Sequence, residues 1–461
     1  MPRLQKMIKM IHEDRVLMVL ALLAKRERVQ VYLVGGAIRD LILSRRRGDY
    51  DFVLHQGDMV FVRKLSRELK GHLFCMGKDE KGRVYRILAG NDILDFNGMD
   101  GSTIGEDLSR RDFTINAIAY SLPEQRFYCH PGSEEDIEKK LIRMVSPEGF
   151  DRDPLRMIRG IRYLSVLADF QLDEKTRGAI RRKARLVRDI PVERIKMEVD
   201  KILLSPKPFL AMRECAALGL FREIFPEIQI PGRLRRTALF RTNAFSHYLR
   251  FLKGLAQWNG WEGDTPLQME ERLILSYIAL FITMGKILAK PDHWAREEPM
   301  SNVAYVTMTR MKFSNRFKEL TKKLMDHHGD LLKLSQSRVG QKALRQFIYR
   351  VDTPVKLLIT FSLLEQRANA NGGLSRKGQN LAQLCHRMKD LCKEGDIISL
   401  PALITGRDII TLGYEPGPVV GYILHCVREK QVRGEIGNRQ QALAYLRETF
   451  GKGHFPQAPP T

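Results

Sequence analysis

The chain has 461 residues, too many for one ordinary hydrophobic core, so we expect three or more domains. Hydrophobic residues make up 44% and charged residues 28% of the sequence, which fits a soluble globular protein. Lys and Arg outnumber Asp and Glu by 77 to 54, a formal net charge of +23. This charge favours nucleic acid as a partner, although a cationic surface kept for solubility would have the same charge.

The N-terminal residues 1–29 are predicted to be helical. They contain the apolar run 16–24, but Glu13 and Asp14 precede it and no small-residue cleavage site follows, so it does not resemble a signal peptide. The longest uncharged run, residues 273–285, is too short to span a bilayer. The six cysteines include no C-x-x-C pair, which excludes a disulfide scaffold and the standard zinc patterns. We therefore expect a cytoplasmic protein with no membrane partner.

Short β-rich runs dominate roughly the first 120 residues. Each ends at glycine or charged residues, and the runs cover residues 29–36, 49–55, 71–77, 82–90 and 92–98. A short helix is predicted at 37–45, between the first two strands. This part of the chain therefore mixes α and β structure.

From about residue 134 the apolar residues recur at the helical period instead. Pro226, Pro231 and Gly232 interrupt this pattern once, and the tail 451–461 is expected to be disordered. The sequence thus predicts an α+β fold, in which a small mixed-sheet head precedes all-helical segments. The predicted domain ranges are 1–133, 134–225, 226–390 and 391–461.

Asp49 and Asp51 flank one tyrosine in the second predicted strand. Side chains at i and i+2 of a strand point to the same face, so the two carboxylates should lie close together. Mg²⁺ is usually bound by one or two carboxylates together with water and substrate phosphates. The pattern is compatible with such a site, and equally with a solvated acidic strand face at a turn.

Gly35 and Gly36 lie where the first strand gives way to a helix, and Arg39 follows three residues later. A glycine turn at this place lets backbone N–H groups approach a phosphate, and the arginine could reach the same anion. A tight turn beside a surface arginine is the alternative.

The run R-R-D-F-T-I-N-A forms a second charged cluster. Arg110 and Arg111 could clamp a triphosphate, Asp112 could hold an arginine in place, and Thr114 or Asn116 could brace the turn. A helix N-terminus with surface charges is the alternative.

A third cluster repeats every three residues, at Asp153, Arg156, Arg159 and Arg162. On a helix, neighbours at this spacing meet, and a paired Asp and Arg offers both acceptors and donors to the edge of a nucleotide base. A basic helix with an i, i+3 salt bridge would show the same spacing.

In combination these clusters resemble the class II tRNA nucleotidyltransferases and the bacterial poly(A) polymerases. The motifs are the glycine–arginine turn followed by D-x-D, then R-R-D-F-T-x-N-A, then D-P-x-R-x-x-R, and finally the run 193–203. They match in order and spacing over about residues 30–225. The run 404–446 also resembles the C-terminal part of many tRNA nucleotidyltransferases, more than the end of poly(A) polymerases.

The resemblance implies a nucleotidyltransferase head, a neck with a nucleotide-reading helix, a helical body and a tRNA-binding tail. It assigns Asp49 and Asp51 as catalytic residues and as ligands of Mg²⁺, which activates the RNA 3′-hydroxyl for in-line attack on the α-phosphorus and release of pyrophosphate. The implied nucleotide-binding residues are Gly35, Gly36, Arg39, Arg111, Asp153, Arg156, Arg159 and Arg162. Among them, Asp153 and Arg156 would read the Watson–Crick edge of the base without a nucleic-acid template.

Three features depart from the family pattern. Arg152 stands where relatives usually have a glutamate, and H-P-G-S-E-E-D at 130–136 replaces the usual D-P-F-G-G. The connection from Asp95 to Arg110 is also shorter than in many members, and in this family a missing loop here accompanies enzymes that add only the two cytidines. The resemblance therefore leaves nucleotide preference open.

We expect a template-independent RNA nucleotidyltransferase that adds C and/or A residues of the CCA end to tRNA, with CTP and ATP as nucleotides. The alternatives are an enzyme adding only CC, a bacterial poly(A) polymerase acting on other RNA 3′ ends, and a non-catalytic RNA-binding protein. Residues 273–288 also resemble a phosphohydrolase motif whose His and Asp are replaced by Ile282 and Thr283, although an ordinary core helix explains them equally well. The oligomeric state stays open.

Overall fold

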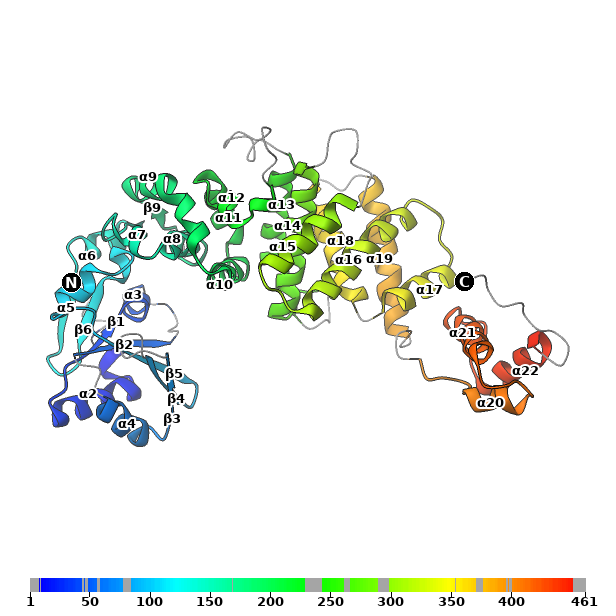
Figure 1. Cartoon of the computed structure of the whole chain (residues 1–461), viewed down its shortest axis with the longest axis horizontal. Coiled ribbons are helices and arrows are strands. Elements are labelled where there is room, and N and C mark those ends of the chain that lie inside the picture. Colours follow the sequence, from blue (N-terminus) through cyan, green and yellow to red (C-terminus); the bar gives the residue numbers. More distant parts are fainter. Residues whose placement is uncertain are drawn as a thin grey trace. The chain divides into compact units, whose positions relative to one another are not determined.

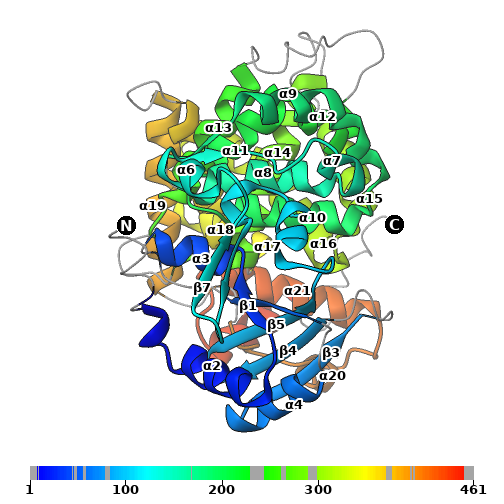
Figure 2. The same ribbon diagram turned by 90° about the vertical axis from the view of Figure 1, so that its left-hand side faces the viewer.

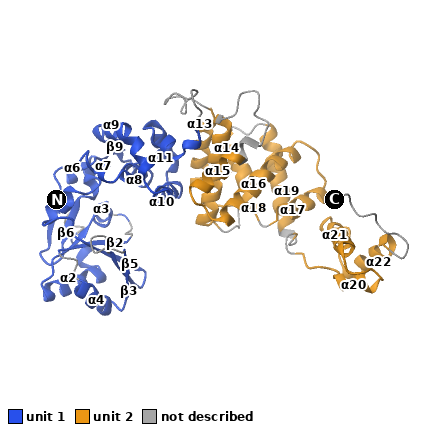
Figure 3. Ribbon diagram, viewed as in Figure 1, with its two compact units in different colours: residues 1–240 blue, residues 241–461 orange. Residues whose placement is uncertain are grey.

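The protein is described from a computed structural model, which divides into two compact units, residues 1–240 and 241–461 (Figure 3). The structure describes residues 8, 10–43, 45, 49–55, 59–77, 84–167, 169–228, 243–260, 266–288, 298–352, 354–369, 376–394, 397 and 400–450. The predicted disordered tail 451–461 and the turn at Pro231 and Gly232 lie outside these residues.

The first unit is built on one mixed sheet with the strand order β3-β4-β5-β2-β1-β6-β7. Its strands are β1 Val31–Val34, β2 Tyr50–Leu54, β3 His72–Met76, β4 Val84–Ala89, β5 Asp92–Gly98, β6 Ile118–Ser121 and β7 Arg126–Cys129. Neighbouring strands are antiparallel except for β2 and β5, which are parallel. Figure 2 shows β5, β4 and β3 side by side at one end of the sheet.

Apolar residues make the centre of this sheet a core. All four residues of β1 and of β6 are buried, and the rings of Tyr50, Phe52 and Phe96 stack along β2 and β5. The edge strand β3 is mostly exposed. Burial of the central strands holds the turns at their ends in fixed positions, and the functional residues lie on those turns.

Helices surround the sheet and continue the first unit (Figure 1). A short parallel pair, β8 Leu141–Ile142 and β9 Gln171–Leu172, lies among them. The described helices of the first unit are α2 Arg15–Glu27, α3 Gly36–Ile42, α4 Met59–Glu68, α5 Ile104–Ser109, η2 Thr114–Asn116, α6 Ser133–Glu138, α7 Gly149–Arg152, α8 Leu155–Val166, α9 Glu174–Lys183, η3 Ala184–Asp189, α10 Val192–Leu203, α11 Pro208–Ala217, α12 Leu220–Ile224 and η4 Pro226–Ile228.

Helix α8 is central to this helical layer. It packs against both α10 and α11, and Gly160 lets it approach the sheet closely, since a Cβ at this position would lie 2.7 Å from Cζ of Phe113. The charged residues of α8 are therefore held beside the turns of the sheet rather than on a separate surface.

The described part of the second unit is helical. Its helices are α13 Asn243–Ala256, α14 Met269–Leu288, α15 Glu298–Arg310, α16 Asn315–Leu334, α17 Gln341–Val351, α18 Val355–Asn369, α19 Arg376–Glu394, α20 Gly406–Thr411, α21 Pro418–Val432 and α22 Arg439–Phe450. Helix α13 packs on α14 and α18. A small core of its own, including Ile409, Ile423 and Leu446, joins the last three helices.

The predicted α+β class with a mixed-sheet head is confirmed. Two strands of the head, β6 and β7, were not predicted, because no strand was assigned from the sequence after residue 98. The structure shows one boundary between compact units, near residue 240, so the finer division into four domains stays a prediction. No described helix is long and apolar enough to cross a bilayer. None of the six cysteines, all of which lie among the described residues, forms a disulfide.

Candidate active site

A polar cavity of about 450 Å³ lies in the first unit, between the turns of the sheet and helix α8. Residues from all three clusters of the sequence line it, although the first and last of them, Gly35 and Arg162, are more than 100 positions apart in the chain. The predicted site residues that line it are Gly35, Gly36, Arg39, Asp51, Arg111, Asp153, Arg156, Arg159 and Arg162. Other lining residues, not predicted as site residues, are Asp100, Asp107, Arg110, Asp112, Asn116 and Tyr163.

Asp49 is the predicted site residue that does not line the cavity. It lies just before β2 and is exposed, whereas Asp51 is half-buried within the strand. The intervening Tyr50 points to the other face of the sheet, where its hydroxyl donates to Asp14 over 2.7 Å. The charge of Asp49 still reaches Asp51, because it contributes to raising the pKa of that carboxyl.

Three charged side chains form a row across neighbouring strands, which begins at Asp51 on the cavity wall. Asp51 is in register with Asp95 on β5, and Asp95 is in register with Arg86 on β4. The guanidinium of Arg86 donates two hydrogen bonds of 2.7 Å to the carboxylate of Asp95. The carboxylate of Asp51 has no hydrogen bond or ion pair with any described residue. Burial, followed by the charge of Asp95, raises the pKa of Asp51 above its ordinary value.

These carboxylates fit a divalent cation. Asp51 carries a desolvated charge beside two other carboxylates, and a cation bound there would relieve both the burial and the repulsion. No group of three or more His, Cys, Asp or Glu among the described residues could enclose a metal alone. Asp51 and Asp49 are therefore the residues that would hold a Mg²⁺ ion whose remaining ligands are water and substrate phosphates.

The glycine turn brings the backbone against an arginine of the second cluster. Gly35 has a φ of +71°, and a Cβ there would lie 3.1 Å from Nη1 of Arg111. A side chain at this position would be strained and would crowd that guanidinium. Arg39 follows on α3 and is buried, donating to Asp40 and, over 2.6 Å, to the side-chain oxygen of Asn116. The turn therefore joins two arginines at one wall of the cavity.

Asp112 holds the second cluster together, as its predicted role of bracing an arginine requires. Its buried carboxylate lies 2.8 Å from Arg159 of α8 and accepts from the amide of Asn116 over 3.1 Å. Burial alone would raise the pKa of Asp112, but Arg159 and the hydrogen bonds hold it below its ordinary value. Asp112 in turn raises the pKa of Arg159. Both groups thus stay charged inside the cavity.

Asn116 and Tyr163 connect the clusters. Tyr163 was not predicted as a site residue, because the spacing of the charged residues does not include it. The amide of Asn116 donates to the Tyr163 hydroxyl over 2.9 Å, and the guanidinium groups of Arg39 and Arg162 lie over the tyrosine ring, 5.3 and 4.8 Å from its centre. A tyrosine four residues after Arg159 on a helix was the available signal.

Arg111 and Arg156 are fixed by different partners. Asp107 accepts from Arg111 over 2.9 Å, while Nη1 of Arg156 donates to the backbone carbonyl of Arg111 over 3.1 Å. Burial lowers the pKa of Arg156. Their guanidinium groups nevertheless line the cavity, where they offer positive charge to an anion.

Asp153 and Arg156 do not form the i, i+3 salt bridge that the spacing left open as an alternative. Asp153 instead pairs with Arg194 of α10, with 3.3 Å between Oδ1 and Nη2. Asp153 has an extended backbone, with φ −143° and ψ 91°, where α7 ends and α8 has not begun. The helical i, i+3 geometry assumed from the spacing therefore does not apply to it.

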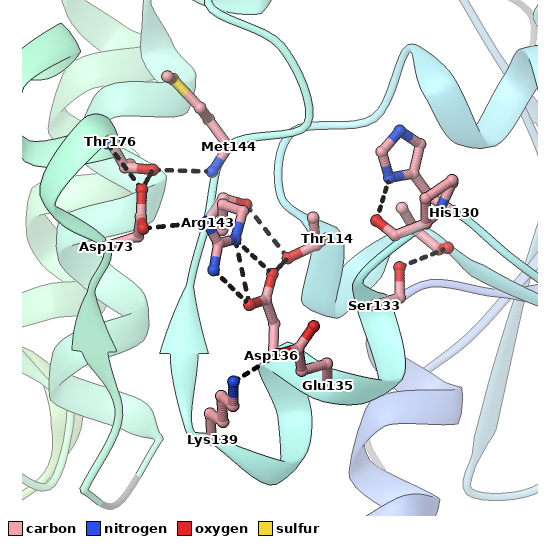
Figure 4. Close-up of polar contacts among 12 residues, drawn as sticks. Thr114, His130, Ser133, Glu135, Asp136, Lys139, Arg143, Met144, Asp173 and Thr176 are labelled. Atoms are coloured by element: carbon pink, nitrogen blue, oxygen red, sulfur yellow. Dashed lines mark hydrogen bonds and ion pairs between the residues drawn. The ribbon is translucent and has the colours of Figure 1, made fainter.

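A buried polar network braces the second cluster from behind (Figure 4). Asp136 belongs to the H-P-G-S-E-E-D run that replaces the usual family motif. It accepts from the Thr114 hydroxyl over 2.7 Å and from Arg143. Arg143 also pairs with Asp173, the N-cap of α9. The run thus keeps a bracing carboxylate although its sequence departs from the family pattern.

An unpaired carboxylate on a strand, a glycine turn and a wall of arginines define the class of a nucleotidyltransferase head. Comparison with known proteins gives the same class. A family model described as "Poly A polymerase head domain" matches residues 31–143, one described as "Probable RNA and SrmB- binding site of polymerase A" matches 169–230, and one described as "tRNA nucleotidyltransferase domain 2 putative" matches 302–446.

Two curated relatives match nearly the whole chain. The CC-adding tRNA nucleotidyltransferase of Thermus thermophilus is 30% identical over 427 residues, covering 90% of this chain and 92% of the relative. The A-adding tRNA nucleotidyltransferase of Deinococcus radiodurans is 27% identical over 429 residues, covering 90% and 94%. The chain therefore belongs to the family of tRNA nucleotidyltransferases and poly(A) polymerases, and it is an enzyme of the tRNA nucleotidyltransferase type.

Solved structures agree on the fold. The Thermotoga maritima CCA-adding enzyme complexed with tRNA is 22% identical and matches with a TM-score of 0.66, covering 97% of this chain and 98% of that one. A complex of a CCA-adding enzyme with CTP is 21% identical and matches with a TM-score of 0.68, at the same coverage.

Proposed function

We propose that the chain adds the two cytidines of the CCA end to tRNA, using CTP and releasing pyrophosphate. One observation supports this most: a single cavity sets the unpaired carboxylate of Asp51 opposite the guanidinium groups of Arg39, Arg111 and Arg159. A carboxylate without a cation partner and a wall lined by guanidinium groups together suit a metal-bound nucleoside triphosphate.

The roles follow from this placement. Asp51, with Asp49 beside it, would hold Mg²⁺, which when bound lowers the pKa of the attacking 3′-hydroxyl and neutralises the phosphate oxygens. Arg39 and Arg111, approached closely by the glycine turn, bind the triphosphate. Arg159, kept charged by Asp112, binds beside them.

Asp153 and Arg156 face the base in this proposal. Asp153 is held by Arg194, whereas Arg156 is held by the backbone carbonyl of Arg111. The two residues therefore read the base as separately held groups rather than as one ion pair. Arg152, which stands where relatives usually have a glutamate, is exposed and lies 3.5 Å from the Ser146 hydroxyl. It therefore does not replace Asp153 or Arg156.

The short connection between β5 and α5 favours addition of cytidine alone. Only residues 99–103 join the two elements, and the connection is pinned, because the N–H of Asp100 donates to Asp107 over 3.0 Å and that of Ser102 donates to Glu106 over 2.8 Å. Such a segment has little freedom to remodel the cavity for a second nucleotide. The match to the CC-adding relative supports the same choice.

The proposal is tested by incubating the full chain with tRNA ending at the discriminator base and with tRNA ending in CC. CTP and ATP are supplied separately and together with Mg²⁺, and the 3′ ends are sequenced. We expect CC on the first substrate and no extension of the second. Addition of A to the CC end would overturn the choice of CC, and a run of A on unrelated RNA would indicate a poly(A) polymerase.

We further propose that the chain works as a head, neck, body and tail with the ranges 1–133, 134–225, 226–390 and 391–461, and that the tail contacts tRNA. The match of residues 302–446 to a tRNA nucleotidyltransferase domain supports a role of the second unit in tRNA recognition. The net charge of +23 suits a polyanionic substrate. A cytoplasmic site of action is the location that tRNA processing favours.

A further inference from the structure

We infer that Arg194 on α10 is a specificity-determining positioning residue, which holds Asp153 so that its free carboxylate oxygen selects a base with an exocyclic amino group. This inference rests on the proposed function and deepens it. The ion pair between Arg194 and Asp153 joins residues 41 positions apart, and Arg194 itself does not line the cavity.

Asp153 needs an outside partner to hold its position. Its backbone is extended between α7 and α8, so no helical neighbour at i+3 or i+4 restrains its side chain. Its carboxylate is about a third exposed, at 29%, and Arg194 is its one ion-pair or hydrogen-bond partner among the described residues. Without that partner the short side chain could turn to solvent.

Helix α10 is a suitable anchor for this contact. Ile195, Val199 and Ile202 are buried, which fixes the helix against α8. One turn after Arg194, Glu198 accepts from Nε of Arg162 over 2.8 Å and is itself buried. Residues at i and i+4 share a helix face. One face of α10 therefore contacts both Asp153, through Arg194, and Arg162, through Glu198.

The chemistry of the free oxygen explains the selection. An ionised carboxylate only accepts hydrogen bonds. Arg194 contacts Oδ1, which leaves Oδ2 of Asp153 for a donor. Cytosine offers an exocyclic amino group on its Watson–Crick edge, whereas uracil has a carbonyl oxygen there, which a carboxylate repels. A carboxylate held in place therefore accepts CTP and rejects UTP, and a mobile one rejects UTP less well.

The test compares Arg194→Gln with Arg188→Gln in the full chain. Arg188 is a matched control, since it is 54% exposed against 51% for Arg194 and pairs with a carboxylate of the same unit, Glu223, away from the cavity. Arg194→Lys restores the charge. The measurement is kcat/KM for CTP and for UTP on tRNA ending at the discriminator base, with the melting temperature of each variant.

We expect Arg194→Gln to lower the CTP-to-UTP ratio of kcat/KM about tenfold, as a small displacement of a recognition group commonly does. Arg194→Lys should recover most of the ratio, and Arg188→Gln should leave it unchanged. An exposed ion pair contributes little to stability, so the melting temperatures should stay close together.

Two results would overturn the inference while leaving the proposed function intact. One is an equal ratio in Arg194→Gln and Arg188→Gln. The other is an equal loss for both nucleotides in Arg194→Gln, which would make the contact purely structural. By contrast, a wild-type chain that adds no cytidine to tRNA would overturn the proposed function itself, and the inference with it.

Discussion

Two shielded carboxylates, one in each unit, differ in whether the protein supplies a cation for them. Asp51 in the first unit has no ion-pair partner among the described residues, and burial together with Asp95 raises its pKa. Glu365 in the second unit is buried too, but it lies 2.6 Å from Nε2 of His328 and 3.5 Å from Nζ of Lys286. Burial alone would raise the pKa of Glu365, yet these neighbours lower it to about 2.

The difference separates a site for a ligand from a structural contact. A buried charge is tolerated when it is paired and hydrogen-bonded, and Glu365 meets this condition within its own unit. Asp51 does not, so its charge costs stability until a cation from outside arrives. Unpaired carboxylates with a raised pKa in a cavity are typical of functional sites. Replacing Asp51 and replacing Glu365 should therefore have opposite effects on activity and stability.

Replacing Asp51 should have the largest effect on activity. Asp51→Asn removes a proposed metal ligand and should lower nucleotide addition on the order of 10⁴-fold, about 5 kcal/mol of transition-state stabilisation. Stability should change the other way. Because the folded pKa of Asp51 is raised above 3.8, its contribution is favourable at low pH and is lost as pH rises, so the neutral Asn should raise the melting temperature at pH 7.

Mg²⁺ gives a second measure of the same substitution. A ligand that binds the folded state raises its melting temperature, so Mg²⁺ should stabilise the wild-type first unit and not Asp51→Asn. Asp92→Asn, a change on β5 away from the cavity, is the control and should keep both activity and the Mg²⁺ response. An active Asp51→Asn enzyme would falsify the metal assignment.

Glu365→Gln should do the reverse, by harming stability and sparing catalysis. The substitution leaves Lys286 without its carboxylate partner and takes the charged acceptor from His328, which for a buried pair should cost about 4 kcal/mol. Urea denaturation measures the loss, and Glu319→Gln on the exposed face of α16 is the control. Addition at low temperature should persist, since Glu365 does not line the cavity. Unchanged stability would mean that the pair is not structural.

Acid should reveal the same contact in the wild-type protein. The folded pKa of Glu365, about 2, lies below its ordinary 4.5, so its stabilisation is complete above pH 4.5 and is lost as pH falls towards 2, at most about 3 kcal/mol. Burial also lowers the pKa of His247, whose ring lies 3.2 Å from the Glu365 carbonyl oxygen. The stabilisation that comes from keeping His247 neutral is present above pH 6.5 and is lost as the pH falls below that value. Denaturation of Glu365→Gln followed from pH 7 to 3 should lack the lower step.

The sequence predicted the head well where glycines and charged turns separate its strands. All five predicted β-rich runs contain an observed strand. It failed at β6 because all four residues, Ile118–Ser121, are buried, and a continuously apolar run shows no period of two. The preceding R-R-D-F-T-I-N-A left a helix N-terminus open as an alternative, whereas its residues Thr114–Asn116 form a 3-10 turn that leads into a central strand.

The site was predictable as a set of residues and not as a set of contacts. All nine predicted residues that line the cavity are glycines or charged residues, and local motifs of the sequence indicated each of them. The partners of these residues come from distant parts of the chain, as for Asp153 and Arg194 or for Asp112 and Arg159. Local spacing carries no information about such pairs, and for Asp153 it offered only Arg156 as an alternative partner.

The smallest effect should come from Arg86, which lies outside the cavity and alters Asp51 only through Asp95. Arg86→Gln removes both hydrogen bonds to Asp95, so the Asp95 charge acts on Asp51 without a neutralising cation. The pKa of Asp51 should then rise further, and the acidic limb of the pH–activity profile should move to higher pH by about one unit or less, as expected for charges across a partly solvated site. The plateau at higher pH with saturating Mg²⁺ should be nearly unchanged, since Asp51 is ionised there in both proteins. Arg63→Gln, an exposed change on α4, is the control, and a profile of Arg86→Gln that coincides with it would show that Asp95 does not influence Asp51.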